Sequence, residues 1–148
     1  MKKDNFHRLK VQVQLVRDRA ARQMPMVRTP DETYQLIKDE ILKWDREKFL
    51  AVMLNARNGV IGIDEASCGS VNSSIVHPRE VFKAAILANA VSIVLIHNHP
   101  SGDFEPSEDD LEITKRLVEA GKILGIEVID HLIVSKEGYY SFKDKGLI

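Results

Sequence analysis

The chain has 148 residues, of which 44% are hydrophobic and 29% are charged, and its formal net charge is −1. This length fits one domain with a core of its own, and ordinary apolar content with little net charge excludes disorder of the chain as a whole. The single cysteine, Cys68, excludes an internal disulfide and a zinc finger built from cysteines. No apolar run approaches the roughly 18 residues of a membrane span and no secretory signal opens the sequence, so we expect a cytoplasmic protein without membrane contact.

The charge is unevenly distributed along the chain. Residues 1–28 carry eight basic and two acidic side chains, which gives +6, so the other residues sum to −7. Such an arm is either a handle for nucleic acid or an acidic partner, or a solvated extension, and the absence of a nucleic-acid motif favours the extension. Val11, Val13 and Leu15 alternate with polar residues, which is typical of an edge strand that could pair across a dimer. We therefore divide the chain into a basic N-terminal arm, residues 1–28, and a main domain, residues 29–148.

The first half of the main domain predicts a helix and a hairpin. Thr29-Pro30-Asp31-Glu32 is a capping box with proline at the first helical position, and it should begin a helix that runs to about Trp44. The continuous apolar run 49–54 predicts a strand covered on both faces. Asn58-Gly59 predicts a hairpin turn into a returning strand. The small and polar stretch 65–74 fits either an irregular segment or more of that strand.

The second half of the domain alternates helices and strands. We expect a helix from Pro78 to about Asn89, a strand over 91–96, a helix from Ser107 to about Leu124 that Gly125 ends, a strand over 126–134 and a short tail over 139–142. This order predicts an α/β domain with a mixed β-sheet flanked by helices. Because such sheets place chemistry at the loops after strand carboxyl ends, the loop after 91–96 is the first place to look.

That loop begins with His97-Asn98-His99-Pro100. Two histidines two residues apart project to the same side of an extended chain, roughly 6–7 Å apart at the backbone, so their imidazoles can converge on one ion. Asp110 lies in the first turn of the following helix, where the helix dipole favours a carboxylate, and it can supply a third ligand. Two imidazoles and one carboxylate leave a fourth tetrahedral position open, which is typical of catalytic zinc sites.

Each residue of this set also has an ordinary structural interpretation. A histidine on an apolar strand is usually a satisfied core residue, and we interpret His131 in this way. Ser107 with an acid three residues later is a common helix cap. His77, before Pro78, is interpreted as a cap or loop contact. The combination of His-x-His-Pro with Ser-x-x-Asp across a strand, a loop and a helix is what favours a metal centre.

The segment 97–110 resembles the JAMM motif of the MPN (JAB-type) zinc metalloprotease superfamily, and more closely that of its bacterial RadC-like branch. The segments 76–82, 130–134 and 138–142 are also similar to this branch. The resemblance covers about residues 29–148. It implies an MPN/JAB-like fold, with a layer architecture like that of cytidine deaminases.

The resemblance further implies one zinc ion per chain, bound by His97, His99 and Asp110. It implies that Ser107 supports the activated water or the oxyanion and that an upstream glutamate acts as general acid and base. Glu47, at the start of the first buried strand, is our first choice for that glutamate, and Glu65 is the alternative. The implied activity is hydrolysis of peptide or isopeptide bonds in a protein or peptide substrate.

Two other functions compete with hydrolysis. The first is an accessory role in DNA repair or recombination, with nucleic-acid or partner binding rather than proteolysis. Fuller members of the RadC-like branch carry an N-terminal helix-hairpin-helix-like region, and residues 1–28 are too few to form one, so only a weak contact of the basic arm with phosphates is expected. The second is a catalytically silent scaffold, which the complete set of ligand types disfavours.

Overall fold

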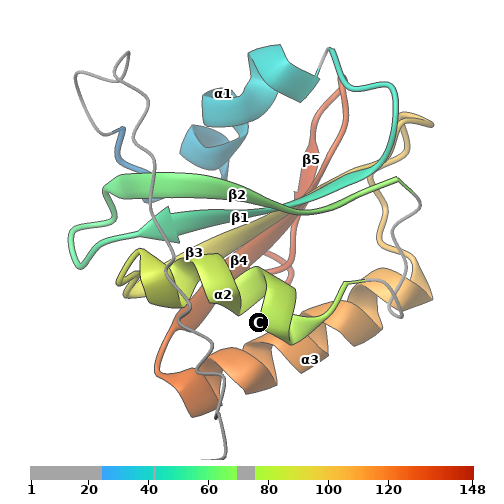
Figure 1. The fold of residues 1–148 in the computed structure, drawn as a ribbon. Coiled ribbons are helices and arrows are strands. Elements are labelled where there is room, and N and C mark those ends of the chain that lie inside the picture. Colours follow the sequence, from blue (N-terminus) through green and yellow to red (C-terminus); the bar gives the residue numbers. More distant parts are fainter. Residues whose placement is uncertain (1–24, 42, 70–75) are drawn as a thin grey trace, which may run out of the picture.

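The computed structural model describes residues 25–41, 43–69 and 76–148. Its elements are α1 (Pro30–Ile41), β1 (Lys48–Leu54), β2 (Val60–Cys68), α2 (Pro78–Leu87), β3 (Ser92–Asn98), α3 (Glu108–Leu124), β4 (Glu127–Val134) and β5 (Tyr139–Ser141) (Figure 1). The edge strand that we predict around residues 11–15, and nearly all of the basic arm, lie outside the described residues.

The described strands form one mixed sheet in the order β2-β1-β3-β4-β5. β3 and β4 are parallel and are connected through α3, whereas the other neighbouring strands are antiparallel. The predicted α/β class with a mixed sheet is therefore confirmed. Because β1 is antiparallel to β3, the start of β1 and the carboxyl ends of β3 and β4 meet at the same edge of the sheet.

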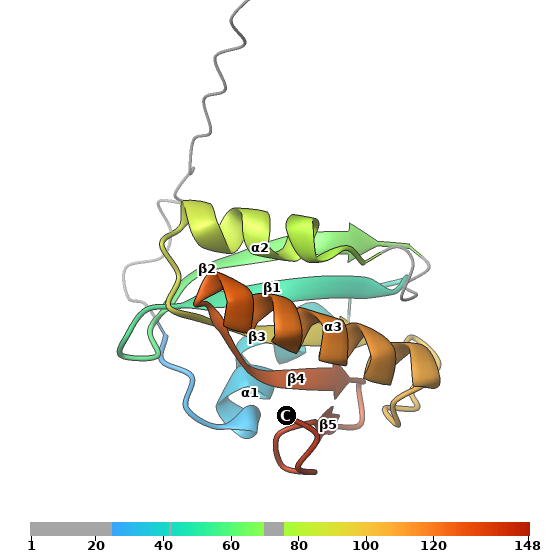
Figure 2. The same cartoon turned by 90° about the horizontal axis from the view of Figure 1, so that it is seen from below.

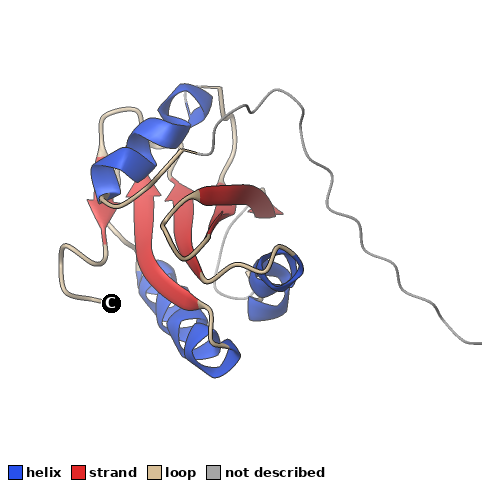
Figure 3. Cartoon of the chain, turned by 90° about the vertical axis from the view of Figure 1, so that its left-hand side faces the viewer, coloured by secondary structure: helices blue, strands red, loops and turns tan. Residues whose placement is uncertain are grey.

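Helices cover both faces of the sheet. Figure 2 shows α2 and α3 together on one face, and in Figure 3 α1 is the upper helix with the strands between it and the other two helices. Each face has its own core cluster, one under α2 and α3 and one under α1. Along β1 successive side chains alternate between the clusters, because side chains of a strand point to opposite faces in turn. This alternation buries both faces of β1, as the apolar run predicted.

Helix α1 begins at the predicted capping box, but it ends earlier than the sequence predicts. The Glu32 backbone N–H donates to Thr29 Oγ1 at 3.2 Å, and the Glu32 carboxylate accepts from the Thr29 N–H at 3.2 Å. The helix ends at Ile41 rather than near Trp44, since the Trp44 N–H bonds back to the Ile41 carbonyl, three residues away, and closes a tight turn. Trp44 still packs against the core cluster under α1.

The structure decides three other boundaries. Asn58 forms the predicted turn with a positive φ of 60°, and pairing with β1 then keeps β2 extended as far as Cys68. β3 continues past the predicted end at Ile96, because His97 pairs with β1 on one side and β4 on the other. α2 ends at Leu87 rather than Asn89, which has a φ of 53°.

Gly121 lies where α3 crosses the sheet, and its replacement by alanine should destabilise the protein. An added Cβ would lie 2.5 Å from the Ile126 carbonyl oxygen and 3.3 Å from the Phe82 ring. We expect a loss of about 1–3 kcal/mol in the free energy of unfolding, although alanine is favoured over glycine in helices by about 1 kcal/mol. Urea unfolding measures this change. Lys122→Ala, at the next and exposed position, is the control, and a more stable Gly121→Ala protein would contradict the close packing.

Candidate metal centre

Three of the predicted site residues meet at the edge where β3 ends and α3 begins. His97, His99 and Asp110 each offer a ligand atom, and these atoms lie within 4.8 Å of one another. His97 Nδ1 lies 2.9 Å from Asp110 Oδ1, and His99 Nε2 lies 3.4 Å from Asp110 Oδ2. His97 and Asp110 are buried, whereas His99 is partly exposed, so the cluster reaches the surface on the His99 side.

The fold explains this convergence. His97 pairs with Phe49 on β1 and shares its face of the sheet, which is the face that α3 covers. The first turn of α3 is held by a reciprocal cap in which Ser107 Oγ accepts from the Asp110 N–H, and Asp110 Oδ2 accepts from the Ser107 N–H at 2.8 Å. The same cap turns the Asp110 carboxylate towards the histidines. The sequence interpretations of Ser107 as a cap and as a site residue are therefore compatible.

A loop carbonyl orients His99. The His99 Nδ1 lies 2.8 Å from the Asp103 carbonyl oxygen, so it carries the proton and donates, which leaves Nε2 free to face Asp110. The loop returns to make this contact through Gly102, which has a φ of +92° that favours glycine. This role of Asp103 could not be predicted from its residue type, because it comes from a backbone oxygen that any residue would carry.

Asp110 is the anionic centre of the cluster. Burial alone would raise its pKa, but hydrogen bonds with His97, His99 and Ser107 outweigh burial and hold the pKa of Asp110 well below its usual range. The pKa of His99 is raised, chiefly by its bond to Asp110 and in part by the nearby charge of Glu47. Asp110 is therefore a carboxylate at neutral pH, the form in which a carboxyl group binds a metal.

The geometry of the cluster fits a divalent metal ion. In a tetrahedral site with bonds of about 2.0–2.1 Å, two ligand atoms lie about 3.3 Å apart, close to the separation of His99 Nε2 and Asp110 Oδ2. His97 Nε2 is buried and has no hydrogen-bond partner among the described residues, which is rare for a buried polar atom. Imidazole and carboxylate are ligands that zinc accepts, although they suit other transition metals too.

The two candidate glutamates lie in different surroundings. Glu47 directly precedes β1, and continuing the register beyond Phe49 and His97 sets it opposite His99. Glu47 is one residue before β1, and alternation continued to this residue places it on the face of Phe49 and the histidines. The charge of Glu47 raises the pKa of His99, which agrees with this placement. Glu65 instead bonds Lys48 Nζ at 2.6 Å, and Lys48 alternates to the opposite face. The structure thus brings Glu47, rather than Glu65, to the face of His97, His99 and Asp110, which we call the metal-ligand cluster.

His131 lies behind the cluster and is only half satisfied. The β3–β4 register shifts by one residue, so that Ile129 is extra and His131 comes to lie beside Leu95 on the α3 face. Thr114 Oγ1 donates to the Asp110 carbonyl and accepts from His131 Nδ1 at 2.6 Å. His131 Nε2 has no hydrogen-bond partner among the described residues. The expectation of a fully satisfied structural histidine is therefore wrong for this nitrogen.

His77 has the role that its position before Pro78 predicts. Its Nδ1 accepts a hydrogen bond from the Arg79 N–H at 3.2 Å and caps the start of α2. His77 is exposed and is not part of the cluster of His97, His99 and Asp110. It is a helix cap rather than a metal ligand.

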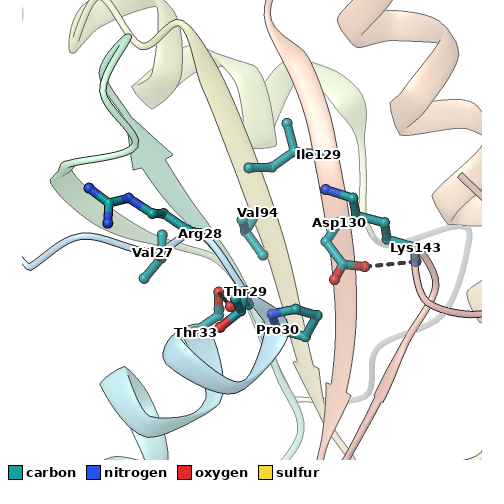
Figure 4. A pocket seen from close by; sticks show the side chains of 9 residues that line it. All are labelled: Val27, Arg28, Thr29, Pro30, Thr33, Val94, Ile129, Asp130 and Lys143. Carbon is teal, nitrogen blue, oxygen red and sulfur yellow. Dashed lines mark hydrogen bonds between the residues drawn. The ribbon is translucent and has the colours of Figure 1, made fainter.

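A buried carboxylate on the opposite face of the sheet does not form a second site. Asp130 accepts from Ser141 Oγ at 2.7 Å and from the Lys143 N–H at 3.0 Å, and so attaches the C-terminal tail to β4. Burial raises the pKa of Asp130. Figure 4 shows its carboxylate beside the start of α1, lining a cavity of about 20 Å³. That volume holds about one water molecule, which is too little for a substrate.

The chain matches the family model described as RadC-like JAB domain over residues 27–147. It belongs to this family, which confirms the resemblance found in the sequence and the JAB/MPN-like fold. The similar curated proteins include UPF0758 proteins of Desulforamulus reducens, 49% identical over 123 residues, of Moorella thermoacetica, 52% identical over 123 residues, and of Rubrobacter xylanophilus, 52% identical over 124 residues.

These relatives are longer proteins. The aligned segments cover 83–84% of this chain and 54% of each of the three relatives, so the chain spans about half their length. The name UPF0758 states no activity. In the part of the chain that the structure describes, every helix is too short or too polar to cross a bilayer.

Acid should destabilise the metal-free protein through His131. Burial, followed by the charge of His97, lowers the pKa of His131 to about 3. The unfolded chain, with a pKa of about 6.5, then binds the proton first, so stability is lost as the pH falls below about 6.5. We expect the free energy of unfolding in EDTA to fall by up to about 1.4 kcal/mol per unit between pH 6 and 4.5.

The His131→Gln variant is the control for this slope. It should be less stable at pH 7 but should depend less on pH between 6 and 4.5. His99 does not contribute in this window, because its raised pKa affects stability only above about pH 6.5, and Asp110 contributes only below about pH 4. Equal slopes in the variant and the parent protein would show that His131 is not buried in its neutral form.

Proposed function

We propose that this chain is a zinc-dependent hydrolase of JAMM type that cleaves peptide or isopeptide bonds in a protein or peptide substrate. The observation that carries the proposal is the convergence of His97, His99 and Asp110 at one sheet edge, with Glu47 on the same face. Membership of the RadC-like JAB domain family supports it. The UPF0758 relatives carry no activity in their name, so the proposal combines the metal-binding geometry of the site with the reaction that the family resemblance implies.

The residues divide the work of hydrolysis. Zinc in this site would supply a Lewis acid that polarises the scissile carbonyl and lowers the pKa of a bound water. Glu47 takes the proton of the attacking water and passes it to the leaving amine. The exposed side of His99 is where a substrate carbonyl can approach. The buried His97 and Asp110 keep their positions through the strand and the helix cap.

Ser107 has a more limited part in this scheme than its motif suggests. Its hydroxyl carries one proton, and the structure shows that proton donated to Asp110 Oδ2 over 2.6 Å. The hydroxyl supports an oxyanion only when this proton turns away from the carboxylate. The contact with Asp110 makes Ser107 first of all a residue that orients a metal ligand.

Metal removal and addition test the metal centre without a substrate. Zinc binds the folded site and raises the free energy of unfolding in proportion to ln(1 + [Zn]/Kd), so free zinc at about 100 times Kd should add about 2.7 kcal/mol. We expect the melting temperature to rise with zinc and to fall with EDTA. The Asp110→Asn variant should lose this response. His77→Gln, which changes an exposed helix cap, should keep it, and a wild-type protein that binds much less than one zinc per chain would refute the centre.

Substitution of the two glutamates tests the acid–base assignment. With zinc and a peptide library, Glu47→Gln should lower cleavage by at least about 100-fold, because loss of a general acid–base group typically costs 10²–10⁴-fold. It should still bind zinc. Glu65→Gln removes only the contact with Lys48 and should keep most of the activity. The assignment fails if Glu65→Gln is inactive while Glu47→Gln cleaves normally.

A further inference from the structure

Asn98, the residue between the two histidines, has a buried side chain with both amide groups engaged. Only 3% of the residue is exposed. Its Oδ1 accepts from the Lys48 N–H at 2.7 Å, and its Nδ2 donates to the Arg46 carbonyl at 3.2 Å. These two backbone groups lie on either side of Glu47. One amide side chain therefore holds the backbone both before and after the proposed acid–base residue.

This contact replaces strand pairing at the point where the pairing stops. The β1–β3 ladder ends with Phe49 opposite His97, so the backbone of residues 46–48 has no further paired residues in β3. The Asn98 side chain bonds there instead, and on the other side the Gly69 N–H donates to the Glu47 carbonyl at 2.9 Å. The backbone of Glu47 is thus attached to β3 through Asn98 and to the end of β2 through Gly69.

These hydrogen bonds matter because the position of the Glu47 backbone determines which atoms its carboxylate can contact. Glu47 lies outside β1, and its side chain has several rotatable bonds, so a fixed main chain limits how far its carboxylate can move from His99. Asn98 is covalently joined to His97 and His99. A shift of the histidine segment therefore moves the attachment point of Glu47 with it.

We propose that Asn98 is a positioning residue that fixes the distance between Glu47 and the metal-ligand cluster by hydrogen-bonding both backbone groups that flank Glu47. The inference rests on the proposed function, in which Glu47 is the acid–base group. It assigns a role to the one residue of the His-x-His segment that is not a ligand.

Cobalt(II) alone is the probe. Its visible spectrum reports the coordination geometry of the ion. The pH at which the spectrum has changed halfway, called the pH midpoint below, reports the protonation of groups next to the ion. The 148-residue wild-type chain, Glu47→Gln, Asn98→Ala and the double variant are loaded with cobalt and titrated with acid and base. We expect Asn98→Ala to bind one cobalt ion per chain, as the wild-type protein does, because all three ligands remain. We expect it to shift the pH midpoint in the same direction as Glu47→Gln and by at least about 0.5 unit, because the nearby charge moves away.

The double variant separates positioning from a general loss of packing. If Asn98 acts through Glu47, Asn98→Ala adds no further shift in the Glu47→Gln background. Asn55→Ala is the matched control, because Asn55 Oδ1 accepts from two backbone N–H groups, of Arg57 and Gly59, at the other end of β1. Asn55→Ala should lower the melting temperature and leave the midpoint unchanged. Asn98→Ser, which leaves a smaller void, replaces Asn98→Ala if the latter does not fold.

The outcomes distinguish this inference from the proposed function. A shifted midpoint in Glu47→Gln with a wild-type midpoint in Asn98→Ala overturns the role of Asn98 and leaves the proposed function standing. The role of Asn98 is also overturned if Asn98→Ala shifts the midpoint by the same amount in the Glu47→Gln background as in the wild-type background, since Asn98 would then act independently of Glu47. Failure of the wild-type protein to bind cobalt, or an unchanged midpoint in Glu47→Gln, overturns the proposed function and this inference together.

Discussion

The register between β1 and β3 is the constraint on which the rest of the site depends. Pairing of Phe49 with His97 buries the first histidine beneath α3, sets Glu47 opposite His99 and brings Asn98 within reach of the backbone on both sides of Glu47. A slip of one residue would turn every side chain of β1 to the other face of the sheet. The two buried core clusters oppose such a slip, because it would exchange apolar residues of β1 between differently shaped surroundings. The same packing that stabilises the fold therefore positions the site.

The cluster itself opposes folding unless its polar groups are satisfied. Asp110 is a buried carboxylate, and without partners its burial would cost several kcal/mol. His97, His99 and Ser107 supply those partners, while one nitrogen of His97 and one of His131 have none among the described residues. Natural proteins keep such incompletely satisfied polar groups mainly at functional sites. The polar groups at this edge thus form a cluster that could hold a metal ion.

Much of the local structure could be predicted from the sequence, because each local signal depends on residues a few positions apart. The capping boxes at Thr29 and Ser107, the turn at Asn58 and the helix end at Gly125, with its φ of 70°, all agree with the structure. The His-x-His and Ser-x-x-Asp pattern also indicated which side chains meet, since strand alternation and helix capping fix their directions. The family match over residues 27–147 agrees with the resemblance found in the sequence.

Only the tertiary structure could decide the features that depend on pairing between distant segments. The end of β2 at Cys68, the extension of β3 through Asn98 and the one-residue shift that turns His131 towards α3 follow from neighbouring strands, not from local residue types. The choice between Glu47 and Glu65 likewise depends on which face each reaches. The sequence by itself determined the chemical types of the site residues and the elements that carry them. Their distances and faces, and the attachment of Glu47 through Asn98, were decided by strand register, because register joins residues that lie about 50 positions apart in the chain.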